Sequence, residues 1–412
     1  MRFNFAEREK FALEFFRKEG ICVVGCDIGA KFSVFAVDGK TYKVEHSKLR
    51  EFKEKILKVA DGRKIKIYLE QTGRYSLPVV ETFLDCAELY LVEGKRVKAA
   101  RELFSLPQKN DYYDARLLAI IGILPVPVIP LDYDAYTLRF LVNRMIRLEK
   151  SFQQAVNRLR QCIAVLFPGE YETFTKERLE QKRGKYLKQL KELLNGFVPF
   201  SAIQEELLIE AQNELQVIEL LLKQRRQVEE RIDLLCEKPH IKRDLEILTS
   251  FPGISKKRAL IIKASYIDIR RFRNWKAFVK FMGYTKQENQ SGTSVKFKKR
   301  INSNRLVRRE MYMLCSFLCS QEGPASDLFS YYYLRTGGIF KKAVHKFSSK
   351  YLRLLFYCLK HGELFNPAFL INSLEDLISP QTIEELRRNV RRLREQRGKV
   401  KKKKEGSNGN SN

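Results

Sequence analysis

The sequence has few of the residues that build disulfides or zinc sites. Its eight cysteines form no Cys-x-x-Cys pair and its four histidines complete no zinc pattern, so we expect reduced, buried thiols in a cytosolic protein. No segment reaches the roughly 20 apolar residues of a membrane-spanning helix, because the longest apolar run, Leu117–Leu131, contains three prolines. The opening residues, MRFNFAEREK, show no secretory signal.

Acidic residues are scarce relative to basic ones, and the imbalance is concentrated late in the chain. The 412 residues hold 78 Lys and Arg against 49 Asp and Glu, a formal net charge of +29. Residues 1–130 carry a net +5, residues 131–250 a net +1, and residues 251–412 a net +23. Such an excess predicts a polyanionic partner, most often nucleic acid, which the last two-fifths of the chain contact.

Residues 1–130 have the pattern of strands that alternate with helices. Asp38-Gly39 is a strong two-residue hairpin signal, because both positions of such a turn need positive φ. A hairpin meander followed by strands alternating with helices predicts an α/β domain with a mixed sheet. We expect strands at 21–26, 32–37, 41–44, 64–69 and 88–92, with helices at 1–19, before 60, at 76–86 and at 111–121.

Two long amphipathic helices are predicted after the prolines. The first has apolar residues in steps of four and three, a heptad seam of Leu141, Met145, Leu148, Phe152, Ala155, Leu159, Cys162 and Leu166. The second runs from about Ser201 to Cys236, and its register changes near Arg225. Such helices pair either with each other, as an antiparallel hairpin, or with a partner chain, and the spacing does not decide between these arrangements.

The strongly basic part of the chain begins with a Pro252-Gly253 turn before a basic helix. A polar loop at 287–294 and a basic strand and helix are expected next. Backbone N–H groups at a helix start and exposed cationic side chains both suit phosphate. The candidate nucleic-acid contacts are Lys256, Lys257, Arg258, Lys296, Lys298, Lys299, Arg300, Arg305, Arg308 and Arg309.

Four acidic residues are candidates for a metal site. Asp27 ends the first strand, Glu70 ends the fourth, and Asp111 and Asp114 lie three apart on one helix. Each alone is typical of a turn or a helix cap. If the strand ends lie side by side under the helix, the four carboxylates cannot all stay ionised without cations. Oxygen ligands suit Mg²⁺ or Mn²⁺, and two such ions clamp the attacking and leaving oxygens of a phosphodiester.

Two motif sets resemble one protein family. The acidic residues in VVGCDIGAKFSVFAVDGK, IYLEQTGRYS and KNDYYDARLLA resemble the DEDD motif of insertion-sequence one-ten transposases, the bridge-RNA-guided recombinases, and are similar to Piv-type DNA invertases. Residues 250–254, 268–272, 281–285 and 290–292 resemble the family's C-terminal transposase domain in order and spacing. The resemblance covers roughly residues 20–365.

The resemblance implies a fold class and a division of the chain. The fold is α/β plus α, with a RuvC- or RNase H-like catalytic domain at 1–130 and a helical coiled-coil region at 131–240. A mostly helical transposase domain with a helix-hairpin-helix-like turn follows at 241–365, and a basic, partly disordered tail at 366–412. The implied setting is the prokaryotic cytoplasm, at the nucleoid, away from membranes.

The resemblance also implies a chemistry. Mg²⁺ or Mn²⁺ bound by the four carboxylates and a serine that becomes covalently attached to DNA would cut and rejoin donor and target strands. The serine is assigned to Ser291, with Ser294 as a weaker candidate, because only one serine directly precedes Gly292. Asn110 departs from the small hydroxyl residue usual in the family. A guide RNA and further copies of the chain, in a dimer or tetramer, are the other implied partners.

Three other functions suit parts of the pattern. A RuvC-like resolvase would use the same carboxylates with water as the nucleophile. An actin-like ATPase shares the strand and turn at 24–29 but needs a second phosphate turn and an adenosine loop, neither of which is found. A non-enzymatic RNA-binding scaffold would not need the carboxylates.

Overall fold

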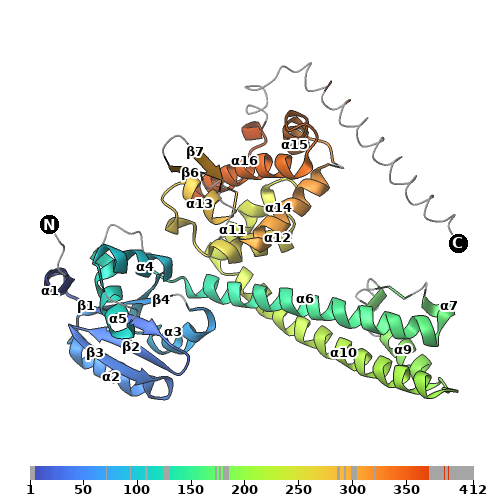
Figure 1. Cartoon of the computed structure of the whole chain (residues 1–412), viewed down its shortest axis with the longest axis horizontal. Coiled ribbons are helices and arrows are strands. Elements are labelled where there is room, and N and C mark those ends of the chain that lie inside the picture. Colours follow the sequence, from blue (N-terminus) through green and yellow to red (C-terminus); the bar gives the residue numbers. More distant parts are fainter. Residues whose placement is uncertain are drawn as a thin grey trace. The chain divides into compact units, whose positions relative to one another are not determined.

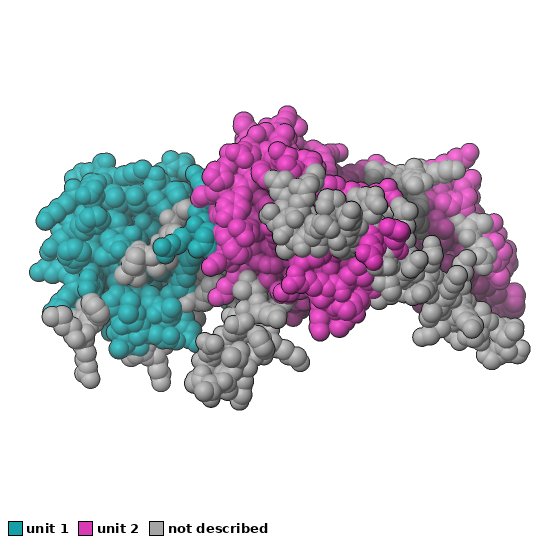
Figure 2. Space-filling model, turned by 90° about the horizontal axis from the view of Figure 1, so that it is seen from above, with its two compact units in different colours: residues 1–133, 270–274 teal, residues 134–269, 275–412 magenta. Residues whose placement is uncertain are grey.

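The chain divides into two units in the computed structural model: Met1–Tyr133 with Arg270–Asn274, and Asp134–Ile269 with Trp275–Asn412 (Figure 2). The predicted division at residues 130, 240 and 365 stays a prediction. The structure describes residues 5–70, 72–92, 94–106, 110–123, 130–171, 174–175, 178–179, 185–284, 288–291, 294–297, 304–319, 321–370, 385 and 388.

A five-stranded sheet forms the centre of the first unit (Figure 1). Its order is β3-β2-β1-β4-β5, with β1–β2 and β2–β3 antiparallel and β1–β4 and β4–β5 parallel. The predicted mixed sheet is therefore confirmed. The turn at Asp38 and Gly39 has φ of +49° and +85°, as the hairpin signal predicts. The strands are β1 Ile21–Ile28, β2 Phe32–Val37, β3 Lys40–Glu45, β4 Lys64–Glu70 and β5 Ala87–Val92.

Helices cover both faces of this sheet because its strands alternate apolar side chains between the faces. One face packs on Phe52 and Ile56 of α2 (Leu49–Ala60) and on Val79 and Phe83 of α3 (Leu77–Phe83). The other packs on α1, α4 and α5. These helices are α1 Phe5–Lys18, α4 Gly94–Leu103 and α5 Asp111–Ile120. Helix α4 was not predicted from the sequence.

The second unit begins with a long helical hairpin. Helices α6 (Tyr133–Leu166) and α10 (Ala202–Cys236) share one apolar core with α9 (Lys185–Asn195). Asp134 pairs with Lys238 near one end, and Arg158 donates to Glu214 at 2.9 Å near the other, so the helices are antiparallel. All eight residues of the predicted first seam are buried. From Phe152 to Leu166 the first seam packs with Ala211, Leu215, Ile218 and Leu222 of α10, so this part of the seams pairs within the chain. Along α10 the buried residues step by three or four and then by six between Leu222 and Val228, which matches the predicted change of register.

The rest of the second unit is mostly helical. The expected polar loop at 287–294 is wrong: β6 and β7 pair there as an antiparallel hairpin, with Ser291 opposite Ser294. The two residues between them, Gly-Thr in the sequence, suit a tight hairpin connection. The elements are α7 Pro168–Tyr171, α11 Pro239–Ser250, α12 Lys256–Tyr266, α13 Trp275–Phe281, β6 Glu288–Ser291, β7 Ser294–Phe297, α14 Arg305–Leu318, α15 Pro324–Arg335 and α16 Phe340–His361.

Two expectations about the whole chain can be compared with these elements. Within the residues that the structure describes, no helix combines the length and the apolar character needed to cross a bilayer. All eight cysteines are free thiols; six of them are buried, and Cys86 and Cys319 are half-buried. The basic tail beyond residue 388 lies outside the described residues.

Because the seam is internal, a charge within it should open the hairpin. Leu159 is fully buried, and Val165 on the same helix is 55% exposed. Leu159→Asp should destabilise α6 and α10 by on the order of 3–5 kcal/mol, since it buries an unpaired charge and leaves a cavity. Hydrogen exchange should accelerate in both helices, and Val165→Asp should leave it unchanged. A smaller assembly by light scattering, with both helices still protected, would mean that the seam joins separate chains.

Candidate active site

Two parallel strands bring the first pair of acidic residues together. In the β1–β4 register Cys26 lies opposite Leu69, so Asp27 and Glu70 are the next residues along neighbouring strands. Parallel strands end at the same edge of a sheet, and ligands of α/β folds collect at that edge. Asp27 is buried and Glu70 is half-buried. The expected side-by-side placement of these two carboxylates is therefore present.

Helix α5 supplies the second pair because its backbone lies directly on β1. A Cβ built on Gly25 would be 1.9 Å from the Ala115 carbonyl oxygen and 2.4 Å from the Ala119 nitrogen, so only glycine allows this contact. Asp111 and Asp114 lie in the first turn of α5. Both carboxylates lie near enough to Asp27 for their charges to raise its pKa.

Asn110 explains how α5 begins. Its side chain accepts a hydrogen bond from the Tyr112 backbone N–H at 2.9 Å, which makes it the N-cap of the helix. Asp111, for which capping was the alternative role, is therefore not needed as the cap, and its exposed carboxylate is available to a ligand. Asparagine and small hydroxyl residues are equivalent as N-caps, so the departure at Asn110 keeps the local structure.

The electrostatics of Asp27 show that the four carboxylates act on one another. Burial is the main cause that raises the Asp27 pKa from 3.8 to about 7, and the charges of Glu70, Asp111 and Asp114 raise this pKa further. A hydrogen bond with the Glu70 carboxyl also contributes. Two carboxyl groups can share a hydrogen bond only when one is protonated, so Asp27 holds a proton below about pH 7. The cluster thus carries more negative charge than its surroundings neutralise.

Helix α4 lies against this cluster at both of its ends. Near its C-terminus, the Arg101 guanidinium holds both oxygens of Asp114, and its Nε donates to Oδ1 at 3.0 Å. At its N-terminus, a Cβ on Gly94 would lie 2.3 Å from Oε1 of Glu70. Asp114, Glu70 and Asp27 all raise the Arg101 pKa, with the hydrogen bonds to Asp114 as the main cause.

The donor atoms suit a hard divalent cation, although the described side chains do not converge on one point. Carboxylate oxygens that repel one another are the ligands that Mg²⁺ and Mn²⁺ prefer. As placed, no three His, Cys, Asp or Glu side chains of the described residues form a metal-binding group. At Asp114 both oxygens accept hydrogen bonds from Arg101.

The predicted phosphate contacts around α12 fall into two kinds. Lys256 and Lys257 lie at the start of the helix with 68% and 55% of their side chains exposed, and they form surface ion pairs with Asp233 and Glu149. Surface ion pairs are weak, so both cations can exchange their partner for phosphate.

Arg258 differs from these two lysines. Its side chain is only 18% exposed, pairs with Glu310 of α14 and donates to the Gly253 carbonyl. Its guanidinium therefore ties α12, α14 and the Pro252-Gly253 turn together, and the prediction of a phosphate contact at Arg258 conflicts with this placement.

The remaining predicted contacts lie around α14. Arg305, Arg308 and Arg309 are exposed in its first turns, where the helix dipole also favours anions. Lys298, Lys299 and Arg300 lie outside the described residues. Ser291, Ser294 and Lys296 are placed in β6 and β7 by their backbones, and their side chains are not part of the description.

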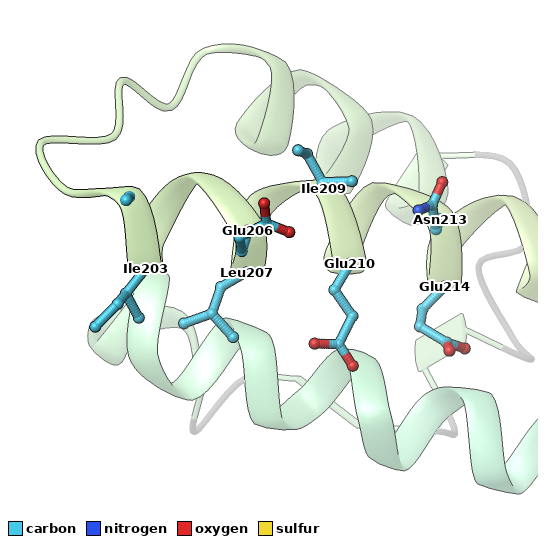
Figure 3. A pocket seen from close by; sticks show the side chains of 8 residues that line it. Ile203, Glu206, Leu207, Ile209, Glu210, Asn213 and Glu214 are labelled. Carbon is cyan, nitrogen blue, oxygen red and sulfur yellow. The ribbon is translucent and has the colours of Figure 1, made fainter.

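A surface pocket of about 670 Å³ lies at the start of α10 and offers a different chemistry (Figure 3). Ile203, Leu207 and Ile209 line it together with Glu206, Glu210 and Glu214. Its charged groups are acidic, and Arg158 already pairs with Glu214. Carboxylates repel phosphates, so this pocket does not suit nucleic acid.

Sequence reasoning missed Arg101 and the contact at Gly25. Arg101 belongs to a helix with few apolar residues and meets a partner 13 positions away. Gly25 stands in the apolar run ICVVGC, where an isolated glycine in a strand is a known sign of close backbone approach. That signal predicts that another backbone approaches β1 at Gly25, without naming α5.

Two family models match the chain. A model of DEDD transposases of the IS110 type, described as a transposase, matches residues 24–168. A second, described as a transposase of the IS116/IS110/IS902 family, matches residues 245–328. Together they span more than half of the chain, and the first includes all four acidic residues. No curated protein matches the chain.

The raised Asp27 pKa predicts a pH dependence of stability without divalent cations. Between about pH 4 and 7 the folded chain keeps a proton that the unfolded chain has lost, so the free energy of unfolding falls as pH rises. The loss is at most about 4 kcal/mol, at 1.36 kcal/mol for each pKa unit. Asp27→Asn should abolish it, whereas Asp61→Asn at an exposed turn should not. Urea unfolding in EDTA at several pH values, followed by pulsed hydrogen exchange of the first unit, measures this free energy. The same change of unfolding free energy with pH in wild type and Asp27→Asn would contradict the prediction.

The contact at Gly25 predicts an intolerance of any side chain. Gly25→Ala should lower the free energy of unfolding of the first unit by on the order of 3 kcal/mol, as overpacking does, because a backbone must move. Gly169→Ala is the control, since a Cβ there meets nothing within 4 Å. Urea unfolding compares the two variants. If Gly25→Ala is as stable as Gly169→Ala, α5 does not depend on this contact.

Proposed function

Because the chain belongs to the IS116/IS110/IS902 family of transposases, we propose that its acidic cluster and Ser291 together cut and rejoin DNA strands. The observation that carries the proposal is the Asp27 pKa, raised to about 7 by burial and by three neighbouring carboxylates. Such a cluster binds cations in preference to protons once a suitable cation is present.

The topology supports a RuvC- or RNase H-like fold for the first unit. Three strands form an antiparallel meander, and β4 and β5 extend the sheet in parallel with β1. This order makes β1 and β4 neighbours, and so brings Asp27 beside Glu70. The fold by itself does not define the reaction, so the proposal depends on the carboxylates.

The four carboxylates would hold Mg²⁺ or Mn²⁺, which would polarise the phosphate and stabilise charge on its oxygens. Asp27 would lose its proton to bind the ion. Asp111 is exposed and would face the substrate, whereas Asp114 is 1% exposed and would complete the site from within. The α5 backbone, held against Gly25, would keep the two aspartates in place during DNA strand exchange.

Ser291 would be the nucleophile. Its Oγ would attack phosphorus, the phosphodiester bond to one sugar oxygen would break, and that oxygen would leave as a hydroxyl group. The resulting phosphoserine ester retains the bond energy, so attack by another strand's hydroxyl would rejoin DNA and release the serine. Ser291 is the last residue of β6, paired with Ser294 of β7.

Exposed cations of the second unit would position nucleic acid. Lys256 and Lys257 at the start of α12, with Arg305 and Arg309 at the start of α14, present charge without any group shaped to read bases. Sequence choice would then come from a bound guide RNA. Purification of the protein with its RNA, followed by sequencing of that RNA, would identify the matching DNA.

A water-using, RuvC-like resolvase is the second candidate. The acidic cluster is the observation that favours it, because the same carboxylates would activate water without any serine.

The covalent intermediate separates these candidates. With a DNA duplex matched to the co-purified RNA, wild-type protein should form an adduct that survives denaturation. Ser291→Ala should bind RNA and DNA but form no adduct, Ser294→Ala should retain it, and Asp27→Ala should lose it together with cleavage. Cleaved DNA without adduct in the wild type would favour the resolvase. An adduct that persists in Ser291→Ala and vanishes in Ser294→Ala would move the nucleophile to Ser294.

Mixing Ser291→Ala with Asp27→Ala protein tests whether different copies of the chain supply the serine and the acidic cluster.

A further inference from the structure

Arg101 is the one cation that the described residues place directly on the acidic cluster. Its guanidinium makes a two-pronged contact with Asp114, whose side chain is 2% exposed. Arginine and carboxylate match each other in this geometry, and such pairs are among the stronger hydrogen bonds in proteins. Only 21% of the Arg101 side chain is exposed, so water screens the pair weakly.

Helix α4 brings a second source of positive charge to the same place. Its first residue, Gly94, adjoins the Glu70 carboxylate, and the N-terminus of a helix carries a partial positive charge. Gly94 and Arg101 are seven residues apart, roughly 10 Å along a helix. One short helix thus touches two of the four carboxylates, and each contact opposes the charge that a metal ion would otherwise neutralise.

A divalent cation would compete with Arg101 for Asp114. Both Asp114 oxygens accept hydrogen bonds from Arg101, and a cation beside a guanidinium would meet strong repulsion. The absence of a three-ligand group among the described residues agrees with this.

From this geometry, and given the proposed metal-dependent function, we infer that Arg101 is the resident counter-ion of the acidic cluster. It holds Asp114 while no divalent cation is bound and must release Asp114 before a cation enters. Helix α4, attached through Arg101 and Gly94, is then the element whose position follows the occupancy of the site. Arg101 is therefore a positioning residue that competes with metal.

The affinity of the full-length protein for Mn²⁺, measured from the electron paramagnetic resonance signal of the free ion, tests whether Arg101 competes with the cation. Arg101→Gln should tighten Mn²⁺ binding by about tenfold, because the competitor is gone. The same variant should melt at a lower temperature in EDTA and should gain more from added Mg²⁺ than the wild type. A merely structural arginine would lower stability in both conditions and would not tighten Mn²⁺ binding.

Lys98→Gln is the matched control. It removes one positive charge from the same helix, but Lys98 is 75% exposed and pairs only weakly with Glu102. Mn²⁺ affinity should therefore stay within about twofold of wild type. An equal gain of Mn²⁺ affinity in Lys98→Gln and Arg101→Gln would overturn the inference. The net charge of the helix, rather than the release of Asp114, would then control Mn²⁺ binding.

Hydrogen exchange in the wild type keeps the inference testable if Arg101→Gln does not fold. Mn²⁺ should speed exchange in α4 and slow it in α5; unchanged or slower exchange in α4 would overturn the inference.

Failure of this inference differs from failure of the proposed function. Mn²⁺ binding that is lost in Asp27→Asn but unaffected by Arg101→Gln removes only the role of Arg101. Mn²⁺ binding that is absent, or unaffected by Asp27→Asn, overturns both.

Discussion

Mutual repulsion among four carboxylates at one edge of a buried sheet is the constraint that the first unit is built to satisfy. Three features of the first unit offset this repulsion. Asp27 keeps a proton, with its pKa raised to about 7; Arg101 binds Asp114; and the N-terminus of α4 lies at Glu70. Each of these groups neutralises part of the negative charge of the cluster. A divalent cation would replace both the Asp27 proton and the Arg101 guanidinium. A stable fold and a cluster of four carboxylates are thus compatible in one arrangement.

The packing of α5 follows from the same constraint. To present two aspartates at the edge, the helix has to lie on β1 closely enough that its first turn reaches Asp27. Gly25 permits this approach, and Asn110 starts the helix at the residue before Asp111. On the far side, Glu9 of α1 binds Arg116 of α5. The backbone positions of Asp111 and Asp114 are therefore fixed by the contact at Gly25 and the cap at Asn110, and Arg101 holds the Asp114 carboxylate itself.

Much of this architecture follows from the sequence because burial leaves periodic patterns. Strands buried on one or both faces gave apolar runs, and the heptad seam of α6 predicted a buried stripe, so both were predicted within a few residues. Helix α4 left no such pattern, since only Val97 and Ala100 face the core. The pairing of Arg101 with Asp114 joins two helices through tertiary contact, and no local spacing encodes it. Strand β6 was missed because its residues, ENQS, are polar.

Net charge alone overstates how much of the second unit is available to nucleic acid. Lys263 is 3% exposed and bonds Asp244 and the Ile267 carbonyl at 2.6 and 2.7 Å, so it serves the fold. Arg258 does the same through Glu310. What distinguishes a binding cation is exposure, since burying a charge requires a permanent partner. The starts of α12 and α14 meet this criterion with Lys256, Lys257 and Arg305. Because Arg258 and Glu310 join these helices, a cation devoted to the fold also sets the spacing of the cations that would meet phosphate.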